Sequence, residues 1–266
     1  MGKIYDIKSI VARYKEAPVS IRQIASEFNL CNVTVSKILK SENVRLWTRQ
    51  DLHLGDLRIN YFKKIDTEIK AYLLGLFTAE GCVYAKNNSK LFNIQLQTDD
   101  SYMIEYIKDE LKAPRKIVQD KRDKSSSISI INDIFVQNLI DNGVTEGKSD
   151  RFFPKISESL IPHYIRGLFD GDGSIVIRKA HSYGSSMRCC VVLLAHSKLI
   201  HQIKEYLEEK LGLSRLNLCS DGGDAYSIRY SKRKDFLAVT DFMYSNANLF
   251  LKRKFQKYEQ ALSYLS

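Results

Sequence analysis

The stretches Tyr72-Leu-Leu-Gly-Leu-Phe-Thr-Ala-Glu80-Gly81 and Tyr164-Ile-Arg-Gly-Leu-Phe-Asp-Gly-Asp172-Gly173 follow one pattern at two places in the chain. Each stretch is an apolar segment of helical length with a central glycine, and each ends in an acid followed by a glycine. These last glycines, Gly81 and Gly173, can take the left-handed conformation that caps a helix. Gly75 and Gly167 lack side chains at the matching central position, so the two helices can pack with their backbones in contact. The repeat therefore predicts two helices packed as a pair, with their terminal acids side by side.

The two terminal acids form a candidate metal site. A carboxylate at a helix C-terminus is unfavourable because that end of the helix dipole is already negative. Two such ends brought together favour a divalent cation, Mg²⁺ or another such as Mn²⁺. Its expected ligands are the side chains of Glu80 and Asp172 and the carbonyls of Ala79 and Gly171. One such helix end alone would be an ordinary helix exit, but the duplication favours a site for phosphodiester hydrolysis.

Composition limits the class of protein. The chain has 266 residues and a formal net charge of +10, which favours a polyanionic partner. No apolar run approaches the roughly 20 residues of a membrane span, and no signal sequence precedes the first helix. We expect a protein of the cytoplasm or of an organelle, without a membrane partner. The five cysteines include no C-x-x-C pair, which argues against a zinc site or a disulfide framework.

Residues 1–45 have the pattern of a helix-turn-helix. Ser20 followed by Gln23 is a capping box, Ala25 permits close helix packing, and Asn29 suits a left-handed turn. The next helix, near residues 32–40, presents a polar and basic face suited to a major groove. The candidate DNA contacts on this face are Asn32, Thr34, Ser36, Lys37 and Lys40. The alternative is a small helical unit that contacts another protein.

Residues 46–64 lack periodicity and are interpreted as a linker. Arg45, just before this segment, and Arg49 within it are candidate contacts to the DNA backbone. A solvated tether is the alternative.

The remainder is an internal duplication of α+β class, with repeats at 65–150 and 151–266. Each half has the order α-β-β-α-β-β-α, and we expect the two halves to be related by a pseudo-twofold axis. In 91–98 apolar and polar residues alternate, which is typical of a strand with one buried face. Strands are also expected at 216–219 and 225–230, joined by a hairpin at Ser220-Asp-Gly-Gly-Asp224.

Polar residues on the open faces of these strands are candidates for reading DNA bases, because amides and arginines recognise base edges in the major groove. They are Asn93, Gln95, Gln97, Asn217 and Arg229. The alternative for each is a solvated surface residue. Basic residues near the joins, Lys148 and the run Lys252-Arg-Lys254, are candidates for approaching the cleaved phosphates, and Lys148 and Lys252 are taken as the catalytic pair. The alternative is that they are solubilising charges at helix ends.

The two motifs resemble the signature of the LAGLIDADG homing endonucleases in their single-chain, two-repeat form. The resemblance covers about residues 65–262 and implies a saddle of two antiparallel sheets over double-stranded DNA. It also implies that Glu80 and Asp172 are metal ligands, with basic residues such as Lys148 and Lys252 nearby. Thr78 departs from the signature, whose internal acid is kept at Asp170 in the second motif. The helical N-terminus resembles accessory DNA-binding modules found on some of these enzymes.

The resulting prediction is a monomeric, metal-dependent endonuclease that cuts both strands of a long asymmetric DNA site. One alternative is a DNA-binding regulator on the same fold that no longer cleaves. Another is a maturase that assists RNA splicing, in which case host intron RNA would be a further partner.

Overall fold

A computed structural model describes residues 6–16, 19–47, 56–86, 89–179 and 187–265. The chain divides into two compact units, one of residues 1–58 with 108–115 and the other of residues 59–107 with 116–266. Arg49, proposed above as a backbone contact, lies outside the described residues. No described helix is long and apolar enough to cross a membrane.

The N-terminal unit contains helices α1 (Ile7–Glu16), α2 (Ile21–Glu27) and α3 (Asn32–Ser41) around a small apolar core. The predicted capping box is present, since the Ser20 side chain accepts from the Gln23 backbone and the Gln23 side chain accepts from Ser20. Asn29 takes the predicted left-handed conformation, with φ 51°. Along α3, Asn32, Lys37 and Lys40 are exposed while Thr34 and Ser36 are half-buried.

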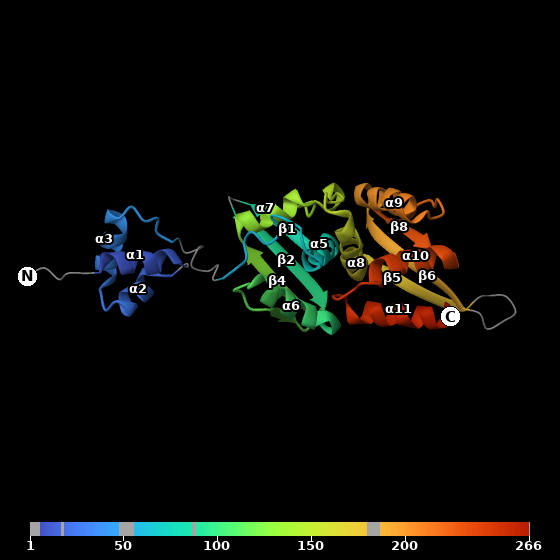
Figure 1. The fold of residues 1–266 in the computed structure, drawn as a ribbon. Helices are drawn as coiled ribbons and strands as arrows, with labels where there is room; N and C mark the ends of the chain where they lie inside the picture. The colour runs from blue at the N-terminus through green and yellow to red at the C-terminus, as the bar shows by residue number, and fades with distance from the viewer. Residues whose placement is uncertain (1–5, 17–18, 48–55, 87–88, 180–186, 266) are drawn as a thin grey trace, which may run out of the picture. The chain divides into compact units, whose positions relative to one another are not determined.

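The larger unit has the predicted α+β class and the predicted duplication (Figure 1). Within its described residues, two four-stranded antiparallel sheets have the equivalent orders β1-β2-β4-β3 and β5-β6-β8-β7. The first half consists of α5 (Glu68–Glu80), β1 (Gly81–Lys86), β2 (Ser89–Gln97), η1 (Thr98–Asp100), α6 (Ser101–Leu111), β3 (Val118–Asp120), β4 (Ser125–Ile131) and α7 (Asp133–Asp141). The second half consists of α8 (Ile161–Asp172), β5 (Ser174–Lys179), β6 (Met187–His196), α9 (Ser197–Leu211), β7 (Cys219–Gly222), β8 (Ala225–Tyr230), α10 (Arg233–Tyr244) and α11 (Lys252–Leu265).

The two motif helices, α5 and α8, lie side by side between the sheets (Figure 1). Their close packing depends on the paired glycines. A Cβ atom on Gly75 would lie 2.0 Å from the carbonyl oxygen of Tyr164, and one on Gly167 would lie 2.0 Å from that of Tyr72. Both contacts are far shorter than van der Waals distance, so neither position accepts a side chain at this helix separation.

In the described part of the chain, helices pack against one face of each sheet. Helix α7 packs on β2, α9 and α10 pack on β6 and β8, and α11 packs on β5 and β6. In β2, Phe92, Ile94 and Leu96 are buried, while the residues between them are exposed or half-buried. This confirms the predicted alternation, and β6 alternates in the same way, so the other face of each sheet is the more exposed one.

Two local expectations were wrong. Gly81 and Gly173 were expected in the left-handed conformation, but both are extended, with φ −76° and −82°. The reason is that each helix runs directly into a strand. Glycine is still required at Gly81, because a Cβ there would lie 2.5 Å from both the Phe77 carbonyl oxygen and the Phe92 ring.

The second error concerns the strand expected at 216–219. The observed strand β7 begins at Cys219, where it pairs with Ser227, and continues into the hairpin. Gly222 and Gly223 form the turn with φ 102° and 55°, as the composition of the loop predicted. Asn217 therefore lies in the loop before the strand, exposed but outside the sheet face.

Candidate active site

The predicted acids are the last residues of the two motif helices. Glu80 ends α5 and Asp172 ends α8, and both side chains are half-buried where the helices meet. Gly171 makes this approach possible, because a Cβ on it would lie 2.3 Å from the Ala79 Cβ and 3.1 Å from the Glu80 Cγ. The structure thus brings together the four residues proposed as metal ligands.

Electrostatics at the two acids are unfavourable without a cation. The pKa of the Glu80 carboxyl is raised by burial and then by the negative charge of Asp172. The pKa of Asp172 is also raised by burial, against the opposing effect of Lys148, Arg151 and Lys254. Both carboxylates would be more stable with a positive charge between them.

These residues fit a hard divalent cation. Carboxylate and carbonyl oxygens are its preferred ligands, and Mg²⁺ keeps several waters when only one or two carboxylates are offered. No group of three or more histidine, cysteine, aspartate and glutamate side chains gathers within the described ranges. Carboxylate and carbonyl oxygens suit Mg²⁺ or Mn²⁺, whereas zinc sites are usually built with histidine and cysteine.

Basic side chains surround the acids and the helix ends. Lys148 Nζ donates a 2.9 Å hydrogen bond to the Ala79 carbonyl, which places this predicted lysine at the site. The same carbonyl accepts from Arg151 Nη1 at 3.4 Å, so it is shared between two cations. A metal that binds Ala79 would have to displace or share these donors.

Lys252, the other predicted lysine, does not lie at the acids. Its Nζ stands 4.6 Å from the centroid of the Tyr102 ring, and its side chain is exposed. Lys254, two residues further along α11, is the buried one: its Nζ donates to the Gly173 carbonyl directly after Asp172. Burial lowers its pKa to about 8, while Asp172 and Glu80 act in the opposite direction. Helix periodicity explains the difference, since positions two apart lie on nearly opposite faces.

Arg151 and His196 are two further residues at the site that the sequence analysis missed. Arg151 is 2% exposed and donates to the carbonyls of Thr78 and Gly81, the latter at 2.6 Å. His196 ends β6 and lines a niche of about 110 Å³ with Asp172, Lys148 and Arg151. The duplication could have revealed His196. Val192 of β6 and Asn93 of β2 are equivalent, because each pairs with the residue directly after a motif glycine. His196 follows Val192 at the same spacing as Gln97 follows Asn93, so it is the counterpart of a residue that was predicted to contact DNA.

A cleft of about 840 Å³ extends from Asp172 across the open face of the second sheet. Its lining includes Arg178, Arg188 and Arg229, so it is positively charged over much of its length. Arg229 was predicted on this face, and it is exposed there. In the first half, Gln95 and Gln97 are exposed and Asn93 is half-buried on the equivalent face. Asn217 is the one predicted base contact that lies off its sheet.

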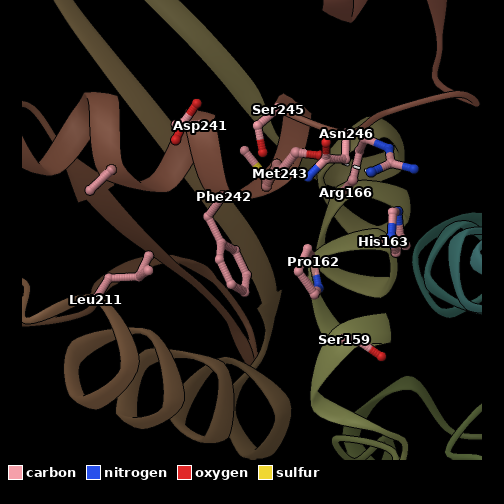
Figure 2. Close-up of a pocket in the computed structure, with 11 residues that line it drawn as sticks. Ser159, Pro162, His163, Arg166, Leu211, Asp241, Phe242, Met243, Ser245 and Asn246 are labelled. Carbon is pink, nitrogen blue, oxygen red and sulfur yellow. Dashed lines mark hydrogen bonds between the residues drawn. The ribbon is translucent and has the colours of Figure 1, made fainter.

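A separate hollow of about 440 Å³ lies beside the N-terminal half of α8, at the end opposite Asp172 (Figure 2). Its walls include Pro162, Phe242 and Arg166. The Arg166 guanidinium donates to the carbonyls of Met243 and Leu249, at 2.8 and 2.9 Å. This arginine thus anchors the end of α10 and the following loop, and it takes no part in the acidic site.

Comparison with known proteins gives a uniform answer for the fold. No family model matches the sequence, and a search of curated proteins finds no match. Among solved structures, the chain is similar to the meganuclease I-SmaMI bound to uncleaveable DNA, with TM-score 0.56 and 14% identity over 75% of this chain and 91% of that one.

Two further structures give similar values. The I-LtrWI LAGLIDADG homing endonuclease bound to target DNA has TM-score 0.52 and 14% identity, covering 78% of this chain and 90% of that one. The LAGLIDADG meganuclease I-AabMI bound to uncleaved DNA has TM-score 0.50 and 18% identity, covering 72% and 91%. The resemblance seen in the two motifs is thereby confirmed at the level of structure: this chain has the LAGLIDADG homing endonuclease fold.

Proposed function

We propose that the chain is a site-specific DNA endonuclease that hydrolyses both strands of a duplex with the help of a divalent cation. The observation that carries the proposal is the meeting of Glu80 and Asp172 at the ends of α5 and α8. These two acids lie among Lys148, Arg151 and Lys254, at the head of an arginine-lined cleft. The similar structures bound to DNA support the same substrate.

The chain's own residues have distinct parts in this reaction. Glu80 and Asp172, with the carbonyls of Ala79 and Gly171, would hold the cation. When bound, the cation supplies positive charge that activates water and stabilises the phosphate and the leaving oxygen. Lys148 and Lys254, which donate to carbonyls at the ends of α5 and α8, would neutralise charge that develops on the two cleaved phosphates.

The net charge of +10 and the cleft provide the binding part of the proposal. Lysine and arginine contacts to phosphates supply most of the affinity of such proteins for DNA and make it dependent on salt. In the N-terminal unit, the exposed Asn32, Lys37 and Lys40 of α3 would contact flanking DNA, and Arg45 would add a backbone contact. The monomeric state and a possible RNA partner stay predictions.

The test begins by selecting bound duplexes from a randomised pool and placing the enriched site in a plasmid. With Mg²⁺, the parent protein should linearise this plasmid. Glu80→Gln and Asp172→Asn should each abolish linearisation while binding in Ca²⁺ stays within about threefold of the parent. Glu209→Gln, an exposed position on α9, is the matched control and should cut normally. Unchanged cutting by both acid variants would overturn the assignment of the site.

A further inference from the structure

The open faces of the two sheets carry different chemistry. In the first sheet, the outward residues Asn93, Gln95 and Gln97 of β2 stand opposite the serines Ser129, Ser127 and Ser125 of β4. Along β2 and β4, none of the described outward positions carries a lysine or arginine. The two central strands therefore present mainly amides and hydroxyls, while the outer strand β3 adds Val118 and the carboxylate of Asp120.

These amides are already partly engaged with their neighbours. Ser129 Oγ donates to Asn93 Oδ1 at 2.9 Å, and Gln95 Nε2 donates to Ser125 Oγ at 2.8 Å. An amide needs both its oxygen and its nitrogen to recognise adenine by two hydrogen bonds. Each amide has two N–H donors and two oxygen lone pairs, so Asn93 and Gln95 could still bond a base, but Ser129 and Ser125 compete for the same groups.

The second sheet presents arginines among aliphatic side chains. Arg178 of β5 stands directly opposite Arg188 of β6, and Arg229 of β8 stands opposite Val192. Like charges directly opposite one another destabilise a sheet. No carboxylate in the described part of the chain pairs with Arg178 or Arg188. The arrangement becomes favourable when an anionic or electron-rich ligand fills the cleft.

Arg229 differs from the other two arginines because its orientation is fixed. Its Nη2 lies 3.2 Å from Asp221 Oδ1, and its Nε lies 3.3 Å from Ser227 Oγ. These contacts leave the remaining guanidinium N–H groups for a ligand in the cleft. A guanidinium held in this way matches the two acceptors on the major-groove edge of guanine.

We propose that discrimination between DNA sequences is concentrated in the half-site bound by the second repeat, where Arg229 recognises a guanine and Asp221 positions it. The neighbouring Val176, Val192 and Leu194 would contact thymine methyl groups, and the first repeat would tolerate more base changes. This inference rests on the proposed function, because it requires the cleft to hold duplex DNA.

The test is a binding selection with the intact chain and a fully randomised duplex pool, with Ca²⁺ in place of Mg²⁺. We expect one half-site to be defined more sharply than the other and to contain a fixed guanine. Arg229→Lys keeps the charge but loses the planar fork of guanidinium donors, so preference for that guanine should fall about tenfold with the salt dependence unchanged. The same measurement on Gln95→Met tests the first sheet, where base preference should change by less than about threefold, and Glu209→Gln on α9 is the matched control.

Asp221→Ala tests whether Asp221 acts by positioning the Arg229 side chain rather than by stabilising the fold. Removing this acid lowers repulsion of DNA, so overall affinity should rise, while the preference for guanine should fall because Arg229 is no longer held. If no sequence is enriched, the proposed function itself fails. If a target emerges with both halves equally defined, or if Arg229→Lys leaves every base preference intact, this inference fails and the proposed function stands.

Discussion

The Tyr72 hydroxyl donates a 2.8 Å hydrogen bond to the carboxylate of Asp170, joining α5 to α8 inside the core. The equivalent hydrogen bond from α8 to α5 is longer, because the Tyr164 hydroxyl donates to the Thr78 hydroxyl at 3.4 Å. Asp170 is fully buried and also accepts from the Tyr244 hydroxyl at 3.0 Å and the Leu251 backbone N–H at 2.7 Å. The internal acid of the second motif therefore anchors the start of α11, a segment that has no equivalent in the first half.

This role predicts that Asp170 matters for folding rather than for binding the metal. Asp170→Ala leaves three buried donors without an acceptor, and each such loss costs about 1–3 kcal/mol. We expect the free energy of unfolding to fall by about 3 kcal/mol or more in urea titrations. Asp170→Asn keeps an acceptor oxygen and should be milder, with plasmid cleavage retained in the folded protein. A stable Asp170→Asn variant that binds DNA but cannot cut would contradict this assignment.

The motif pair made most of the fold predictable from sequence. The alternation in β2, the paired glycines and the terminal acids each depend on local spacing, and each was found as expected. The failed prediction that Lys252 lies at the acids depends on tertiary contacts. Which of Lys252 and Lys254 faces the acids depends on the rotation of α11 about its axis. That rotation is set by the anchor at Asp170 and by contact with the first half. No local pattern contains that information.

The first half supplies that contact through a buried acid. Arg253 Nε lies 2.7 Å from Asp100 Oδ2, and Asp100 is 1% exposed. The backbone N–H of Lys252 also donates to the Tyr102 hydroxyl at 2.7 Å. Residues at 100–102 and 252–253 meet only because the duplicated halves pack together, so the lysine that faces the acids could be identified only in the folded chain.

The packing of the glycines gives a second prediction. Gly→Ala in a helix normally stabilises it by about 0.5–1 kcal/mol. Gly75→Ala should do the opposite, because its methyl group would meet the Tyr164 carbonyl oxygen at 2.0 Å. Overpacking typically costs about 1–3 kcal/mol, and we expect the upper end of this range from urea unfolding. Gln256→Ala, on the exposed face of α11, is the control and should change stability by less than about 0.5 kcal/mol.

A third prediction separates the two lysines of α11. Lys254→Met removes a buried charge beside Asp172 and should slow plasmid cleavage by about 100-fold with little change in DNA binding. Lys252→Met removes only a contact with the Tyr102 ring and should leave the cleavage rate within about threefold. Lys254→Arg should restore part of the rate if charge is what matters. Equal effects of the two methionine substitutions would show that position on the helix is irrelevant.

The last prediction concerns the cation and does not depend on cleavage. Burial and mutual repulsion raise the pKa of Glu80, and burial raises that of Asp172, so the folded protein binds protons more tightly than the unfolded chain. Without metal, stability should therefore fall as pH rises above the ordinary carboxyl range of about 4. The double variant Glu80→Gln/Asp172→Asn should lack the loss of stability that these two carboxyls cause. In EDTA at neutral pH it should therefore melt at a higher temperature than the parent.

Addition of Mg²⁺ or Mn²⁺ should reverse the order of the melting temperatures, so that the parent melts above the double variant. A ligand at 100 times its Kd stabilises the folded state by about 2.7 kcal/mol. For a chain of this size that corresponds to an increase in Tm of several degrees, roughly 2–4 °C per kcal/mol, measured by differential scanning calorimetry. The double variant should show no increase, and Glu209→Gln should respond like the parent. An equal increase in the parent and the double variant would place the bound cation elsewhere, because Glu80 and Asp172 would then contribute nothing to holding it.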